Sequence, residues 1–100
     1  MFARLVSAQA ITDKIDEGIR TWKEKDMPLS ESVKGYRGAY CLVDRKVGKV
    51  ISMTLWDTEE DARADERSAL HQEQVNMYQG PMLGEPIAEY FEVSAKDKID

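Results

Sequence analysis

The chain has 100 residues and a mass of 11.4 kDa, the size of one domain, and its 42% hydrophobic content excludes a disordered segment. Six glycines and three prolines without a period exclude a collagen-like fibre. The net charge of −5 disfavours a general binder of nucleic acid or of anionic membranes. We therefore expect a single domain over residues 1–100, with its core in about residues 1–94 and a short polar tail.

Cysteine and histidine each occur once, as Cys41 and His71. This count excludes an intramolecular disulfide and a Cys/His zinc site built from one chain. No run approaches the ~20 apolar residues of a membrane span, and the apolar start is interrupted by Arg4 and too short for a signal peptide. The sequence thus predicts a soluble cytoplasmic protein that binds no membrane and carries no metal, haem or flavin.

The first half of the chain predicts a strand, a helix and a hairpin. Residues 2–9 are short and apolar, typical of a strand, and Thr12 is the expected cap of the helix that follows. Apolar residues then recur at spacings of four, four and three, which indicates a helix face: Ile11, Ile15, Ile19 and Trp22. Pro28 is expected to kink this helix or end its regular part. After a glycine-rich turn, residues 39–45 and 49–56 predict two strands of a hairpin.

The second half predicts a helix and a final strand. Thr58 precedes three acidic residues, the pattern of a helix start, and a polar helix is expected to run to about Gln79. Its expected buried stripe is Ala62, Ala69, Leu70, Met77 and Tyr78. Residues 80–86 contain three helix breakers and predict a loop, and residues 87–94 alternate as a strand.

The predicted order β-α-β-β-α-β indicates an α+β, ferredoxin-like fold, with a four-stranded antiparallel sheet on one side of two helices. The middle strands are apolar on both faces: Ile51, Met53 and Leu55 on one, Val50 and Trp56 on the other. Two helices can cover only one face, so the second must meet water, a ligand or another subunit. We expect the face with Trp56 to be the uncovered one, and to be buried in a homodimer.

Three features carry a resemblance to a known family. They are the element order, the turn Gly35-Tyr36-Arg37-Gly38-Ala39 that enters the second strand, and Leu55-Trp56 followed by the acidic helix start Asp57-Thr58-Glu59-Glu60-Asp61-Ala62. In these features the chain resembles the antibiotic biosynthesis monooxygenase-like (ABM) group of dimeric α/β-barrel proteins over residues 1–94. The resemblance implies two sheets packed face to face in a dimer, with a pocket in each subunit between the sheet and its helices. Members include cofactor-independent oxygenases of aromatic polyketides and haem-degrading enzymes.

The haem-degrading branch uses an Asn on the first strand, a Trp at the end of the third, and a His ten positions later. Trp56 is present, but the tenth position after it is Glu66, and His71 lies fifteen beyond. Asn76 is the sole asparagine and is far from the first strand. Two of the three parts are missing, which disfavours this branch.

The oxygenase branch implies a cofactor-free monooxygenase acting on a small aromatic of the phenol, hydroquinone or anthrone type. Such a substrate reacts with oxygen once deprotonated, so the protein must supply a dry pocket, orientation and a proton acceptor. The catalytic candidates are Trp56, His71, Tyr40 and Arg37. The substrate-binding candidates are Tyr36, Trp22, Tyr90 and Met53. Each also has a plain structural interpretation, as a core or interface aromatic or as a solvated surface residue.

Other chemistries lack their motifs. No nucleophile elbow of the G-x-S-x-G type, no phosphate-binding loop and no dinucleotide fingerprint occurs. Three hypotheses therefore stay open: a cofactor-free oxygenase, a non-catalytic dimeric module that binds a small ligand, and an assembly subunit.

Overall fold

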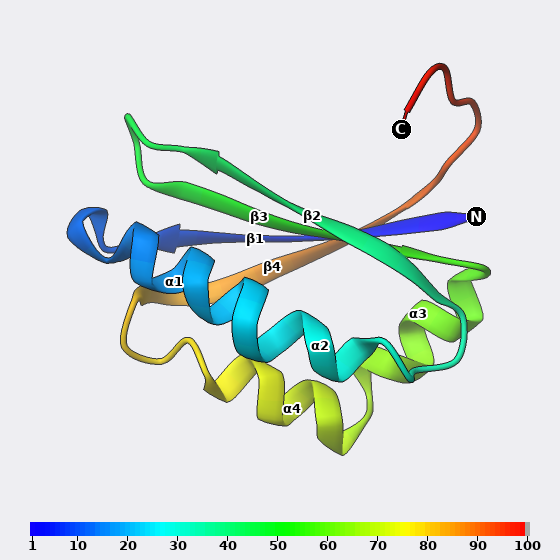
Figure 1. Cartoon of the computed structure of the whole chain (residues 1–100), viewed down its shortest axis with the longest axis horizontal. Helices are drawn as coiled ribbons and strands as arrows, with labels where there is room; N and C mark the ends of the chain where they lie inside the picture. Colours follow the sequence, from blue (N-terminus) through cyan, green and yellow to red (C-terminus); the bar gives the residue numbers. More distant parts are fainter. Residues whose placement is uncertain (100) are drawn as a thin grey trace.

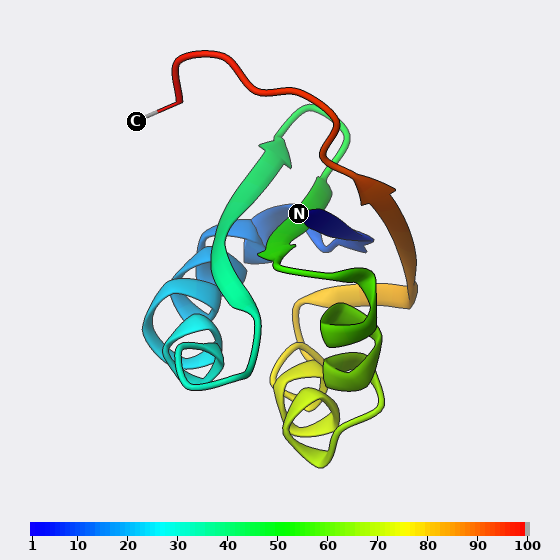
Figure 2. The ribbon, with the colours of Figure 1, turned by 90° about the vertical axis from the view of Figure 1, so that its right-hand side faces the viewer.

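The computed structural model describes residues 1–99 and has a four-stranded antiparallel sheet. Strands β1 (Phe2–Ala10), β2 (Tyr36–Asp44), β3 (Lys49–Trp56) and β4 (Met82–Glu92) lie in the order β2-β3-β1-β4. All helical segments cover the same face of this sheet (Figures 1 and 2). The predicted α+β, ferredoxin-like fold is thereby confirmed. No helix in this described part is both long and apolar enough to cross a bilayer.

The first helical stretch runs in four pieces. They are a 3-10 turn η1 (Thr12–Lys14), helix α1 (Ile15–Thr21), a π-helical turn η2 (Trp22–Asp26) and helix α2 (Met27–Ser30). The prediction that Thr12 caps this stretch is wrong. Ile11 occupies the cap position in extended backbone, and no side chain caps η1.

The π-helical turn η2 directly precedes α2, which has Pro28 in its first turn. Proline has no N–H to donate to the preceding turn and its ring crowds that turn, so the regular ladder cannot pass through it. Instead the N–H of Met27 donates to the carbonyl of Trp22, five residues back. Pro28 therefore distorts the helix, as predicted. Asp26, the last residue of the π-helical turn, is buried.

The second helical stretch is broken where one continuous helix was predicted. Helix α3 (Glu59–Glu66) begins as expected, with the Thr58 hydroxyl accepting from the Asp61 N–H at 3.0 Å. Ser68 then caps a separate helix, α4 (Ala69–Asn76), by accepting from the His71 N–H at 3.1 Å. A cap requires non-helical backbone, so the hydroxyl at Ser68 divides the stretch.

The break also changes which residues of the stretch are buried. Of the predicted stripe, Ala62 is fully buried, but Ala69 is exposed. The buried positions include two polar residues, Asp65 and Gln74, that apolar periodicity could not select. The helical face toward the sheet is therefore partly polar.

Two strands begin earlier than predicted. Strand β2 starts at Tyr36 because a register shift between Tyr36 and Gly38 lets the turn residues pair with β3. Gly38 has φ +133° and Gly35 has φ +83°, backbone that favours glycine. Strand β4 starts at Met82 rather than at residue 87, because Met82 pairs with Ala10 at the end of β1.

The expectation that Trp56 lies on the uncovered face is wrong. The register pairs Trp56 with Phe2 and sets it on the face that carries Arg4 and Thr54, and its side chain is fully buried beneath the helices. The alternation along β3 was predicted correctly, but only the folded helices decide which face they cover.

The uncovered face is nevertheless apolar. It carries Ile51, Met53 and Leu55 of β3. Four large side chains on the outer strands of this face stay exposed: Tyr40 43%, Leu42 44%, Ile87 64% and Phe91 49%. A contiguous apolar face of this kind is typical of an interaction surface.

Candidate functional site

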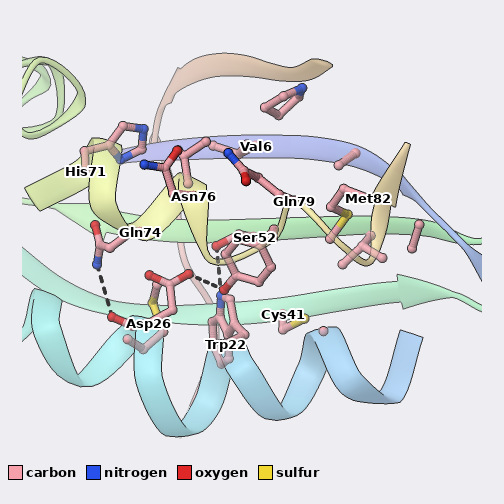
Figure 3. Close-up of a pocket in the computed structure, with 18 of the residues that line it drawn as sticks. Val6, Trp22, Asp26, Cys41, Ser52, His71, Gln74, Asn76, Gln79 and Met82 are labelled. Carbon is pink, nitrogen blue, oxygen red and sulfur yellow. Dashed lines mark hydrogen bonds between the residues drawn. The ribbon is translucent and has the colours of Figure 1, made fainter. Parts of the chain in front are cut away.

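A cavity of about 460 Å³ lies between the sheet and the two helical stretches. Figure 3 shows side chains from β1, β3 and both stretches converging on it. Its lining includes Arg4, Val6, Cys41, Val50, Ser52, Thr54 and Glu85 from the sheet, Lys14, Ile15, Trp22, Asp26 and Ser30 from the first stretch, and His71, Gln74, Val75 and Tyr78 from the second. This volume is in the range of small-ligand pockets, and the mixture of an apolar wall with a few polar groups is typical of them.

The aromatic wall of the cavity is held in place by a hydrogen bond. The indole Nε1–H of Trp22 donates to the Ser52 hydroxyl at 2.9 Å, which ties η2 to β3 (Figure 3). The indole therefore has a fixed orientation and presents its apolar surface as a lining residue.

A buried ion pair borders the same cavity. Arg4 Nη2 donates to Asp65 Oδ2 at 2.9 Å, and Arg4 Nη1 donates to the Ala62 carbonyl at 2.9 Å. The guanidinium also lies over the Trp56 ring, 5.1 Å from its centroid. The three contacts compensate the charge of an arginine that is only 4% exposed.

His71 stands next to this ion pair. Its Nδ1 is 3.7 Å from Asp65 Oδ2, and its side chain is 20% exposed. Burial and the nearby Arg4 lower the pKa of His71 below its ordinary value, against a weaker opposing effect of Asp65. The imidazole is therefore neutral near pH 7 and can accept a proton.

Asp26 forms a second polar centre. The Tyr78 hydroxyl donates to Asp26 Oδ2, and Gln74 Nε2 donates to the Asp26 carbonyl at 3.1 Å and to Ser30 Oγ at 2.9 Å. Burial raises the pKa of Asp26 to about 6, although Tyr78 and Arg4 oppose the effect. Burial and the Asp26 carboxylate likewise raise the pKa of Tyr78. These bonds join the two helical stretches across the cavity.

Of the residues predicted for the site, the structure places Trp22 and His71 in the cavity lining. Trp56 lies outside the lining, behind Arg4, and its Nε1–H donates to the Thr54 hydroxyl at 2.8 Å. Tyr36 packs edge-on against Trp56 with ring centroids 5.6 Å apart, and its hydroxyl contacts the Met27 sulfur. Tyr36 and Trp56 thus form one cluster next to the cavity wall.

The other predicted residues lie elsewhere. Arg37 is exposed and pairs with Asp57 at the turn. Tyr40 and Met53 are cross-strand partners on the uncovered face. The Tyr90 ring lies beneath the Arg63 guanidinium, which is 4.0 Å from the ring centroid. None of these four residues lines the cavity.

Sequence reasoning missed the polar residues of the site: Arg4, Asp26, Asp65, Gln74 and Tyr78. Helical spacing carried a partial signal, because Asp26 follows Trp22 by four residues and Tyr78 follows Gln74 by four. Arg4 and Asp65 pair between β1 and α3, which are far apart in the sequence, so the spacing of neighbouring residues could not predict this ion pair.

The residues present do not reproduce the haem-degrading arrangement. The cavity side of β1 carries Arg4, Val6 and Ala8, so the asparagine of that branch is missing there. Among residues 1–99, no group of three or more His, Cys, Asp or Glu side chains is placed to hold a metal ion.

Sequence comparison finds two curated relatives. No family model matches the chain. It is 34% identical over 64 residues to uncharacterized protein Rv2557 of Mycobacterium tuberculosis strain H37Rv, and equally to MT2634 of strain CDC 1551. The match covers 64% of this chain but only 29% of the length of each relative.

Comparison with solved structures gives matches that cover nearly the whole chain. A monooxygenase from the gene ActVA-Orf6 of Streptomyces coelicolor, in complex with nanaomycin D, superposes with a TM-score of 0.76 at 17% identity, covering 99% of this chain and 92% of that one. The heme-degrader MhuD of Mycobacterium tuberculosis, with two hemes bound, has a TM-score of 0.76 at 13% identity, covering 98% and 100%. A third chain, an antibiotic biosynthesis monooxygenase, has a TM-score of 0.71 at 10% identity, covering 95% and 100%. The chain therefore has the fold of the antibiotic biosynthesis monooxygenase-like proteins.

Proposed function

We propose that the cavity binds a small aromatic compound of the phenol, hydroquinone or anthrone type and promotes its oxidation by molecular oxygen without a cofactor. The observation that carries this proposal is a half-buried, neutral histidine lining a cavity whose other walls are largely apolar. The structural neighbours described as monooxygenases, one of them in complex with nanaomycin D, support it at the level of the fold.

The chemistry requires one proton acceptor. For an anthrone-type substrate, His71 removes a proton from the activated methylene, and the resulting carbanion donates its electrons to oxygen to give a hydroperoxide. Loss of water then leaves a carbonyl, so one oxygen atom enters the product and the other leaves as water. The substrate supplies all the electrons. Protonated His71 first returns the methylene proton to the peroxide oxygen, which gives the hydroperoxide; it then removes the remaining C–H proton as the O–O bond breaks and passes that proton to the departing hydroxide.

The remaining side chains position the substrate and the base. Trp22, fixed by Ser52, offers a flat apolar surface against which an aromatic ring can stack. Trp56 acts indirectly, because it supports the Arg4 guanidinium that pairs with Asp65 beside His71. A low-dielectric site of this kind strengthens the electrostatic interactions within it.

We further propose that the chain is a homodimer through the uncovered sheet face. Tyr40 and Leu42 of β2 and Ile87 and Phe91 of β4 expose apolar surface there, with Met53 between them and Glu89 as a charged residue on the same face. Burying this surface against a second copy removes it from water. Tyr40 and Met53, predicted as site residues, then belong to the interface.

The direct test is oxygen uptake with anthrone and with hydroquinone, measured against buffer alone without added metal or flavin. We expect uptake above buffer for the wild type. We expect His71→Gln to slow turnover by about 100-fold or more, with little change in ligand affinity. Glu73→Gln, an exposed change on the same helix, is the matched control and should behave as wild type.

The same experiment separates the second candidate function. If the aromatic compounds bind but oxygen is consumed no faster than in buffer, the chain is a non-catalytic binding module. If His71→Gln retains full uptake, the histidine is not the base and the mechanism above is wrong.

A further inference from the structure

One oxygen of the Asp26 carboxyl group has no partner. Oδ2 accepts from the Tyr78 hydroxyl, whereas Oδ1 is buried without any hydrogen bond. Asp26 is 5% exposed, and it lines the cavity together with Tyr78. A buried carboxylate oxygen without a partner is costly, and native structures contain few of them.

The surrounding bonds keep Asp26 in this position. Its backbone carbonyl accepts from Gln74, which also donates to Ser30 one turn along the helix. The hydroxyl of Tyr78 holds the carboxyl group from the opposite stretch. The backbone and one carboxyl oxygen are therefore held by other residues. Oδ1 itself has almost no accessible surface, so a ligand hydroxyl reaches it only when neighbouring side chains move aside.

We propose that Asp26 determines ligand specificity: its Oδ1 accepts a hydrogen bond from a hydroxyl group of the aromatic ligand. This inference rests on the proposed function and narrows its preferred substrates to aromatics that carry a free hydroxyl, such as hydroquinones and hydroxylated anthrones; unsubstituted anthrone should be the weaker substrate. An ether in the same place brings a methyl group against the carboxylate and leaves Oδ1 unsatisfied. A site built for a hydroxyl rejects the analogue that lacks it, because its own polar group then stays unpaired.

The charges around Asp26 also select against anionic ligands. Arg4 of β1 and Asp65 of α3 act on Asp26 from the sheet and the second stretch, and Tyr78 bonds to it directly. Arg4 is already paired with Asp65, and His71 is neutral near pH 7. Within residues 1–99 the ionised Asp26 has no ion-pair partner, although Lys14 and Glu85 also line the cavity. We therefore expect a neutral hydroxyl to fit beside Asp26 and a carboxylate there to be repelled.

The test compares two probes that differ by one hydrogen-bond donor, 1-naphthol and 1-methoxynaphthalene, by isothermal titration calorimetry at pH 7.5. We expect wild type to bind 1-naphthol about 10- to 100-fold more tightly, the worth of one hydrogen bond to a charged group. In Asp26→Asn the amide oxygen takes the Tyr78 bond and the amide N–H₂ faces the ligand. The preference should then fall to about one or invert. Asp13→Asn, at an exposed carboxylate of η1, should keep the wild-type ratio.

A measurement on the unmodified chain keeps the test independent of the variant's folding. The pKa of Asp26 can be measured by nuclear magnetic resonance of the chain labelled with ¹³C-aspartate. Saturation by 1-naphthol should lower this pKa, because the ligand hydroxyl stabilises the carboxylate. Saturation by 1-methoxynaphthalene should not lower it.

Equal wild-type affinities for the two probes, or an equal ratio in wild type and Asp26→Asn, would overturn the inference. If oxygen uptake persists in either case, the proposed function survives alone. If neither probe binds wild type and no uptake occurs, both fail together.

Discussion

Replacing Asp26 by asparagine should stabilise the fold at neutral pH and leave it nearly unchanged in acid. Burial raises the pKa of Asp26 from its ordinary 3.8 to about 6, so the folded chain keeps a proton that the unfolded chain releases over this window. The free energy of unfolding therefore falls as the pH rises from about 4 to 6. The change in pKa corresponds to about 3 kcal/mol. The wild type is therefore less stable above pH 6 than below pH 4 by about this amount. Asparagine has no proton to lose, and its oxygen still accepts from Tyr78.

Urea unfolding of wild type and Asp26→Asn at five values between pH 4 and pH 8 measures this effect. The difference in unfolding free energy, variant minus wild type, should rise by about 3 kcal/mol across the window and then level off. Other titrating groups are common to both proteins and cancel. Asp13→Asn, on the surface, should give a flat difference. A flat difference for Asp26→Asn as well would refute the assignment of a buried, weakly ionising carboxyl group at this position.

Three further predictions concern the fold and its assembly. Leu42→Glu on the uncovered face should convert a micromolar dimer to monomer by light scattering; a monomeric wild type would contradict the proposed interface. Asp65→Ala leaves the Arg4 charge buried and unpaired, so urea unfolding should show a loss of about 3–5 kcal/mol, and a loss below about 1 would argue against the ion pair. In Gly35→Ala the new Cβ is strained by the backbone φ of +83° and collides with the Asp61 side chain, so the melting temperature should fall by about 4 °C or more. An unchanged melting temperature would show that the turn relaxes freely.

The fold was predictable because its elements follow simple periods. Strand β3 alternates with period two, and Thr58 with its acidic followers marks the start of α3. These signals are local, and they fix the order β-α-β-β-α-β and hence the topology. Local signals could not decide which face of the sheet the helices cover, so Trp56 was assigned to the wrong face.

The site was less predictable because its centre is polar. Asp26, Asp65 and Gln74 are buried, whereas apolar periodicity assigns such residues to the surface. Their burial depends on partners far away in sequence, such as Arg4 for Asp65 and Tyr78 for Asp26. His71 and Trp22 were predicted for chemical reasons, as a proton acceptor and an aromatic surface, and both line the cavity.

The hydrogen bonds between the two helical stretches bear on how a ligand enters. Helices α2 and α4 lie side by side below the sheet (Figure 1). Two bonds from Gln74 and one from Tyr78 cross the seam between η2–α2 and the end of α4. Breaking all three costs roughly 3–6 kcal/mol, less than or comparable to the global stability of a small domain. The stretches can thus separate transiently while the sheet remains intact, and amide hydrogens of α2 and α4 should exchange faster than those of β1 and β3. We expect a ligand to enter the cavity through this seam.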